Sequence, residues 1–205
     1  MGARHPPTSY LEQELGGFLD SVARREPAPG GGSVAAVTVS LAAALVEMAA
    51  RYSEDLLSDG SYLVDSAKHL RVRAAELADL DALLYQEVIA SRASTDERDP
   101  ALRRDTIRTA LHRASEVPLE IAQVGVETAV LGAQLVVEGR DSLRGDAMTA
   151  VLLAEAGVRS AAQLVGINVL AGGCDAQLVR RAEGCVDRAA DAAKAAFSEQ
   201  DAVDG

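Results

Sequence analysis

The chain has 205 residues, of which 48% are hydrophobic, 25% are charged and only 3% are aromatic, with no Trp. These proportions are typical of one folded domain, and its core must be filled by Ala, Leu and Val, which favours packed helices. The formal net charge of −11 predicts repulsion of nucleic acids and anionic membrane surfaces, so we expect neither as a partner.

The N-terminus and the longest apolar stretch are both informative about location. Residues 1–7 are short of apolar side chains and broken by two prolines, unlike a secretory signal. The apolar stretch Val34 to Val46 ends at Glu47 and is too short to span a bilayer. We therefore expect a cytoplasmic protein, in which Cys174 and Cys185 are free thiols.

The first expected helix begins at Ser9, with Glu12 in a capping-box position, and ends near Arg25. The sequence predicts a disordered tail over 1–8, one helical domain over 9–199 and a C-terminal tail over 200–205. After the first helix, two prolines and three glycines break the chain. A second helix follows, which is capped by Ser33 and runs to about Leu57.

This second helix is apolar on nearly every side. Such a helix is buried on most faces, so it lies either centrally in a bundle or at an oligomer interface. The sequence favours neither alternative.

The third helix follows the turn Asp59-Gly60 and keeps its apolar residues at alternating spacings of four and three as far as Val88. Asp81 lies on that apolar seam. An ionised carboxylate there needs a partner, an opening onto a ligand cavity or a raised pKa. Alternatively, the helix is rotated so that Asp81 lies at the solvent edge.

The fourth helix starts near Ala101 and meets Pro118, which should kink it; residues 119–137 are then a bent extension or a separate helix. Within that stretch Gly125, Thr128 and Gly132 form a stripe of small residues that permits close approach of another helix.

The fifth helix is expected to be capped by Asp146 and to carry Glu155 on its apolar seam. Gly172-Gly173 stops it near Val169, and one more helix follows. No segment shows the two-residue period of a strand. The sequence therefore predicts an all-α, up-and-down bundle of about six helices.

Several common site types are absent from the sequence, including a P-loop, a dinucleotide-binding glycine motif and a His-Glu-x-x-His zinc motif. Neither His69 nor His112 follows a Glu three residues earlier, as a di-iron bundle would require. We expect no metal. The turn from Pro29 to Ser33 is the best candidate contact, because its glycines allow close approach and the next helix exposes free N–H groups.

Four stretches resemble one known family. EPAPGGGSVAAVTVSLAAALVEMAA at 26–50 is similar to the opening signature of the formiminotransferase-cyclodeaminase and methenyltetrahydrofolate cyclohydrolase family. ELADLDALLYQEV around Asp81, SEVPLEIA at 115–122 and GDAMTAVLLAEAGVRSAAQLVGINV at 145–169 extend the similarity. Their order and spacing match as well, so the resemblance covers residues 9 to 197.

The resemblance implies an all-helical homodimer whose folate site lies near the subunit interface, with a tetrahydrofolate derivative as substrate. In the cyclodeaminase reaction, N10 attacks the N5-formimino carbon and ammonia leaves. In the cyclohydrolase reaction, water opens the methenyl bridge to give 10-formyl-tetrahydrofolate. Both reactions need proton transfer near a carbon that bears positive charge, which a carboxylate can supply. The sequence does not choose between them.

Candidate residues follow from the resemblance. The candidate acid–base groups are Asp81, Asp146 and Glu155, although each also has a structural interpretation: a paired core acid, a helix cap and an acid facing a nearby Arg. Backbone contacts with the folate are assigned to Gly30, Gly31, Gly32 and Ser33, and a contact with its glutamate carboxylate to Arg51.

Two segments depart from the family pattern. Family members commonly read Gly-Asn-x-Asn-x-x-Ser-Asp where this chain has GRDSLRGD at 139–146, and often carry a lysine-rich segment where it has SDGSY at 58–62. The alternative hypothesis is therefore a catalytically altered or inactive member that acts as a ligand-binding or assembly module.

Overall fold

A computed structural model describes residues 9–93 and 100–203, with side chains as far as residue 198. The described residues form six α-helices and two short 3₁₀ turns, and no strand occurs among them. The helices are α1 (Leu15–Ala23), α2 (Gly31–Ser53), α3 (Gly60–Ala93), α4 (Pro100–Glu138), α5 (Arg144–Gly172) and α6 (Ala176–Val203), and the 3₁₀ turns are η1 (Tyr10–Glu12) and η2 (Asp141–Leu143). This confirms the predicted all-α fold.

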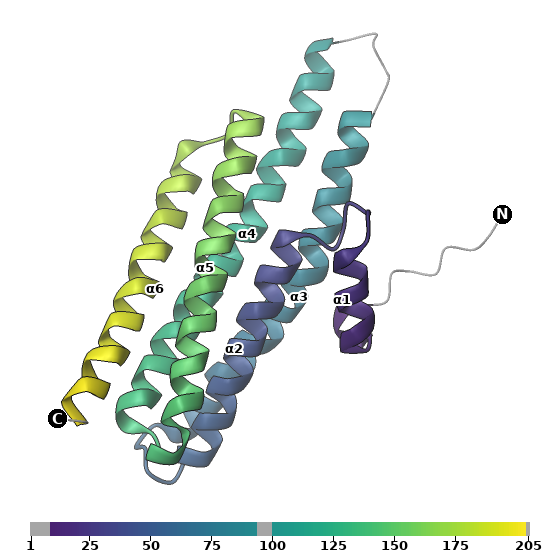
Figure 1. Cartoon of the computed structure of the whole chain (residues 1–205). Coiled ribbons are helices and arrows are strands. Elements are labelled where there is room, and N and C mark those ends of the chain that lie inside the picture. The colour runs from purple at the N-terminus through teal and green to yellow at the C-terminus, as the bar shows by residue number, and fades with distance from the viewer. Residues whose placement is uncertain (1–8, 94–99, 204–205) are drawn as a thin grey trace.

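The long helices alternate in direction, as the prediction of an up-and-down bundle requires (Figure 1). α2 lies between α3 and α5, α4 packs on both of these helices, and α6 covers the side where α4 and α5 meet. The short α1 lies outside the bundle, with only Phe18 buried. α2 is thus packed against three other helices, and one of its faces points outward from the bundle.

The N-terminal helix expected from Ser9 to Arg25 is interrupted. Ser9 caps only η1, where its Oγ accepts a hydrogen bond from the N–H of Leu11, and the chain is extended at Gln13 and Glu14 before α1 begins. The capping box with Glu12 does not form, because a 3₁₀ turn of three residues ends before a second turn of helix can develop.

The start of α2 also differs from the expectation. The N-cap is Gly30, not Ser33, and the helix ends at Ser53 rather than near Leu57. Ser33 is the third residue of the helix and is fully buried. Its hydroxyl donates to the backbone oxygen of Ala78 in α3, 2.9 Å away, so it ties two helices together instead of capping its own.

α4 continues through Pro118 as a single helix, which excludes a separate second helix over 119–137. The small-residue stripe on α4 permits close packing, as predicted. A Cβ atom added to Gly125 would lie 2.5 Å from Val158 of α5, and one added to Gly132 would lie 2.9 Å from Val151. Both contacts are closer than real Cβ atoms allow, so glycine is needed at these crossings.

α5 begins three residues earlier than expected. Its N-cap is Leu143, and Asp146 is the third helical residue with no capping hydrogen bond from its side chain. The predicted cap is therefore wrong, since η2 leads directly into α5 and leaves no extended residue at Asp146. Gly173, with φ of 57°, ends the helix as predicted. α6 then continues to Val203, beyond the predicted boundary at 199.

Three segments are long and apolar enough to cross a membrane by length and composition: Gly31–Ser53, Pro100–Glu138 and Asp141–Gly172. The expectation that the first is too short was based on residues 34–46 alone, whereas the helix has 23 residues. Within the bundle, 56%, 56% and 44% of these apolar windows are buried.

Candidate functional site

A cavity of about 260 Å³ lies at the N-terminal end of α2. It exists because α2 begins part-way along the bundle, while α3, α4 and α5 continue past it (Figure 1). The walls come from the turn before α2 and from these three helices. The lining residues are Pro27, Ala28, Gly30, Gly31, Gly32, Asp81, Ala82, Tyr85, Pro118, Leu164, Ile167 and Asn168.

Asp81 reaches from α3 to the first turn of α2. The Ser33 hydroxyl, whose single proton is shared between the Ala78 oxygen and Asp81, lies 3.2 Å from Oδ2 of Asp81. The carboxylate also accepts a hydrogen bond from the Ser33 backbone N–H. A carboxylate at a helix N-terminus satisfies free N–H donors and interacts favourably with the helix dipole. Asp81 thus performs the capping role that the sequence assigned to Ser33.

Gly32 makes this approach possible. A Cβ atom at Gly32 would lie 2.0 Å from Oδ1 of Asp81, so any other residue would push the carboxylate away. Gly31, by contrast, has only the two methyl carbons of Leu164 near its Cβ position, at 3.9 Å. Of the two adjacent glycines, only Gly32 is required by the position of the acid, because a side chain at Gly31 would make an ordinary van der Waals contact.

The environment of Asp81 raises the pKa of its carboxyl group. Burial is the largest cause, and the two hydrogen bonds from Ser33 oppose it by stabilising the charged form. A raised carboxyl pKa brings its two protonation states closer in free energy near neutral pH, which suits a group that both accepts and donates protons.

The segment before α1 lies close to Asp81 and to its neighbour Asp79 on α3. The backbone N–H of Tyr10 donates to Oδ1 of Asp79 at 2.9 Å, and its ring packs edge-on against Phe18 with centroids 5.8 Å apart. Burial raises the pKa of the Tyr10 hydroxyl, with added contributions from the charges of Asp79 and Asp81. The N-terminal segment is thus anchored beside the cavity.

The other two candidate acids lie elsewhere in the same subunit. Glu155 is in the middle of α5 and pairs with Arg159, with 2.6 Å between Oε1 and an Nη atom, which matches the structural alternative considered for it. Asp146 is in the first turn of α5, at the end of the bundle opposite the cavity (Figure 1). Of the three, only Asp81 lines the cavity.

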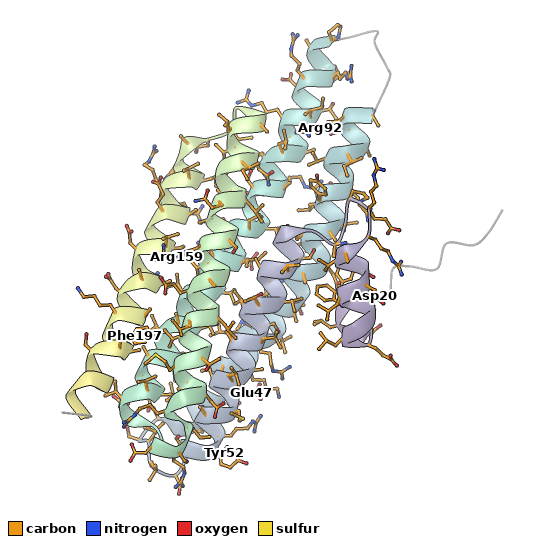
Figure 2. The ribbon with its side chains drawn as sticks, in the orientation of Figure 1. Asp20, Glu47, Tyr52, Arg92, Arg159 and Phe197 are labelled. Carbon is orange, nitrogen blue, oxygen red and sulfur yellow. The ribbon has the colours of Figure 1, made fainter. Side chains whose placement is uncertain are left out.

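Arg51 is also distant from the glycine turn. It lies 18 residues beyond Ser33 in α2, or about 27 Å along a helix that rises about 1.5 Å per residue. Figure 2 shows its partner Glu47 in the C-terminal part of α2, toward Tyr52. Glu47 accepts hydrogen bonds from Arg51 at 2.6 Å and from Arg71 of α3 at 2.7 Å.

Glu47 is 8% exposed. Burial on its own would raise the pKa of this carboxyl group, but the hydrogen bonds and charges of Arg71 and Arg51 together lower it. One carboxylate thus orients two guanidinium groups, which remain partly exposed.

The sequence analysis gave no site role to Tyr85, Pro118 or Asn168, three of the residues that line the cavity. Tyr85 and Asn168 lie within the segments that carry the family resemblance, one turn beyond Asp81 on α3 and near the end of α5. Pro118 was considered only as a helix breaker. Their shared position depends on how three helices pack, which no local pattern encodes.

Comparison with known proteins decides the family. Residues 14–187 match the formiminotransferase-cyclodeaminase family. The chain belongs to this family. The predicted resemblance is thereby confirmed, and it covers most of the bundle.

Relatives of the chain include cyclohydrolases and cyclodeaminases. The chain is 32% identical over 160 residues to a methenyltetrahydrofolate cyclohydrolase from Methylorubrum extorquens, covering 74% of this chain and 76% of that protein. It is 30% identical over 174 residues to the formimidoyltransferase-cyclodeaminase of Mus musculus, where the match spans 80% of this chain but 32% of the mouse protein. A formiminotetrahydrofolate cyclodeaminase from Thermotoga maritima has the same fold, with a TM-score of 0.84 at 22% identity over 95% of this chain and 99% of that one.

Proposed function

We propose that the chain is an enzyme that acts on the one-carbon bridge of a tetrahydrofolate, as a methenyltetrahydrofolate cyclohydrolase or a formimidoyltetrahydrofolate cyclodeaminase. The observation that carries this proposal is the position of Asp81: a half-buried carboxyl group with a raised pKa, lining a cavity next to the glycine turn. The names of the relatives supply the substrate class.

In the cyclohydrolase reaction Asp81 acts first as a base. The oxygen of water bonds to the cationic methenyl carbon while one water proton passes to the Asp81 carboxylate. The carbon–N5 bond then breaks, N5 takes the proton back from Asp81, and the remaining hydroxyl proton goes to solvent. The product is 10-formyl-tetrahydrofolate, with one proton released overall.

In the cyclodeaminase reaction the same group acts as an acid. The formimino nitrogen first takes up one proton from solvent. N10 then bonds to the formimino carbon, and Asp81 donates a second proton to the departing nitrogen, which leaves as ammonia. The N10 proton passes to the Asp81 carboxylate and restores its protonated state. The product is methenyl-tetrahydrofolate, with one proton taken up overall. Both the cyclohydrolase and the cyclodeaminase reaction therefore need one carboxyl group whose charged and neutral forms are both accessible.

Asp146, Glu155 and Arg51 stay predictions from the family resemblance. Replacing Asp146 with Asn tests the first directly: lost turnover at an unchanged melting temperature would indicate a chemical role. Since α5 shows no cap at Asp146, a loss of stability alone would indicate packing.

We also infer that the protein is a homodimer in which α2 meets its counterpart. An apolar stripe runs along the outward face of α2 with spacings of three and four, and includes Val34, Leu41, Leu45, Met48 and Tyr52, of which Leu41 is 56% exposed and Tyr52 62%. A groove beside it, between α2 and α5, is lined mostly by small residues. An antiparallel pairing of the two α2 helices would carry the Glu47–Arg51 end of each toward the cavity of the other.

The assay follows the absorbance of methenyl-tetrahydrofolate. A cyclohydrolase removes this absorbance when methenyl-tetrahydrofolate is the substrate, and a cyclodeaminase generates it from 5-formimino-tetrahydrofolate. We expect turnover of at least one substrate. Verified folded protein that changes neither would contradict the proposal, and folate binding without turnover would favour the non-catalytic alternative.

A further inference from the structure

Pro118 leaves a carbonyl group without its helical partner. Inside an α-helix, each carbonyl oxygen accepts from the N–H four residues later, and proline has no N–H. The oxygen of Ala114 in α4 is in this position. It accepts instead from Nδ2 of Asn168 in α5, 2.8 Å away. A side chain from a neighbouring helix thus replaces the missing backbone donor.

This contact fixes the orientation of the Asn168 amide. A carbonyl oxygen only accepts hydrogen bonds, so the amide nitrogen must face Ala114 and the amide oxygen must face away from it. Within the described residues no side chain or backbone donor contacts Oδ1 of Asn168. Because Asn168 and Pro118 both line the cavity, the arrangement leaves an oriented acceptor at the site.

The rest of the cavity suits a flat heterocycle. Its walls include the apolar side chains of Ala82, Pro118, Leu164 and Ile167, and the polar side chains that line it are those of Asp81, Tyr85 and Asn168. At about 260 Å³, it is smaller than the ~300–1,000 Å³ typical of pockets that enclose a whole drug-sized ligand. It therefore matches one ring system of a folate rather than the entire molecule.

We propose that Asn168 is a specificity-determining residue whose Oδ1 accepts a hydrogen bond from the exocyclic 2-amino group of the pterin ring, and that Pro118 is the positioning residue that orients it. The inference rests on the proposed function, because the one-carbon bridge adjoins the pterin ring and places that ring in the same cavity as Asp81. A ring with a carbonyl oxygen in place of the 2-amino group would leave Oδ1 facing another acceptor, and polar sites reject such mismatches strongly.

The test measures binding by calorimetry with three probes: 5-formyl-tetrahydrofolate, pterin, and lumazine, which carries an oxygen in place of the 2-amino group of pterin. Asn168→Ala should weaken 5-formyl-tetrahydrofolate about tenfold and abolish the preference for pterin over lumazine. Gln163→Ala, on the exposed side of α5, is the matched control and should bind all three as the wild type does.

Pro118→Ala separates positioning from packing. It restores an N–H for Ala114, so α4 should become more stable, and the melting temperature should rise. The same change frees the Asn168 amide to rotate, so binding should weaken several-fold in a more stable protein. In the Asn168→Ala background, Pro118→Ala should weaken binding clearly less than it does alone, because the residue it positions is gone and only its own contact with the ring is lost.

Three results would overturn the inference. The first is a folded Asn168→Ala variant that binds 5-formyl-tetrahydrofolate as tightly as the wild type does. This result would leave the proposed function intact. The second is additive weakening by Pro118→Ala and Asn168→Ala. The third is a wild type that binds neither pterin nor folate, which contradicts both proposals. Pterin binding that depends on Asn168, without turnover of either folate substrate, would contradict only the proposed function.

Discussion

Asp81 experiences two opposing influences, and Ser33 moderates them. Burial favours the neutral carboxylic acid, whereas the hydroxyl and the backbone N–H of Ser33 favour the carboxylate. Ser33 is fully buried and does not line the cavity. We therefore assign Ser33 a positioning role on Asp81, where the sequence suggested direct contact with the folate.

Replacing Ser33 with Ala should change the pH dependence of activity. The substitution removes a hydrogen bond that lowers the pKa of Asp81, so that pKa should rise further above the ordinary carboxyl range. If Asp81 must be charged to act as a base, the acidic limb of kcat/KM moves to higher pH. The measurement is a pH–rate profile of both proteins.

The control for this profile is Ser160→Ala. Ser160 is exposed on α5 and its hydroxyl donates only to Ala156 of its own helix, so its pH profile should match that of the wild type. A Ser33→Ala profile that also matches, with the fold intact, would refute the link between Ser33 and Asp81. The Ser33→Ala variant itself should lose about 1 kcal/mol of stability, because it lacks the buried hydrogen bond of the Ser33 hydroxyl.

At the scale of the helices, prolines and glycines made most boundaries predictable from the sequence. The residues that cap the helices could not be predicted in this way. The turn from Pro29 to Ser33 precedes α2 and Gly173 ends α5, in both places because of the backbone preferences of proline and glycine. The first turn of α2 is capped by Asp81, 48 residues away in sequence, and no local pattern specifies such a partner. The position of Asp81 on an apolar seam did signal an unusual acid.

The same limit applied to the candidate site. The family resemblance identified the glycine turn and Asp81 together, and the structure brings both to one cavity. It also identified Asp146 and Arg51, which lie toward the opposite end of the bundle. Sequence similarity supplies candidate residues but does not indicate which of them share a site, because that depends on helix order and on any second subunit.

Two glycines of α5 provide a test of close helix packing. A Cβ atom at Gly157 would lie 2.6 Å from Val39 and 3.4 Å from the backbone oxygen of Ala35, both in α2. Gly157→Ala should therefore cost about 1–3 kcal/mol, as overpacked cores do. The measurement is urea denaturation.

Gly166→Ala is the matched control in the same helix, since nothing lies within 4 Å of its Cβ position. It should stabilise the protein by about 0.5–1 kcal/mol, because alanine loses less conformational entropy than glycine in a helix. Equal effects of the two substitutions would contradict the close packing of α2 on α5.

For the whole molecule, the outward face of α2 is the feature that the bundle does not explain. The sequence left open whether this apolar helix is central or at an interface, and the structure shows that it is buried on most sides with an exposed apolar stripe on the remaining one. The net charge of −11 opposes self-association at low ionic strength, so an apolar contact must outweigh that repulsion.

Leu41→Glu should convert the inferred dimer into a monomer, because it places a charge in the centre of the stripe where Leu41 is 56% exposed. Val137→Glu on α4, where the side chain is 50% exposed, adds the same charge away from α2 and should leave the dimer unchanged. Light scattering gives the mass of each. A monomeric wild type, or a Leu41→Glu dimer, would refute pairing through α2.

In the proposed reactions Asp81 acts at the one-carbon bridge, and Asp81→Asn tests this role most directly. Asparagine preserves the shape and can still accept from the Ser33 N–H, so the fold should survive. Because burial raises the pKa of Asp81 in the folded state, the acid's contribution to stability falls as pH rises from the ordinary carboxyl range through that raised pKa. The variant should therefore melt at or above the wild-type temperature at neutral pH.

The deciding measurement is turnover of methenyl-tetrahydrofolate and 5-formimino-tetrahydrofolate by Asp81→Asn, with Asp65→Asn on the exposed surface of α3 as the control. We predict that kcat falls about 10²–10⁴-fold at position 81, with binding of 5-formyl-tetrahydrofolate retained, and that Asp65→Asn remains fully active. A folded Asp81→Asn protein with wild-type kcat would contradict the account.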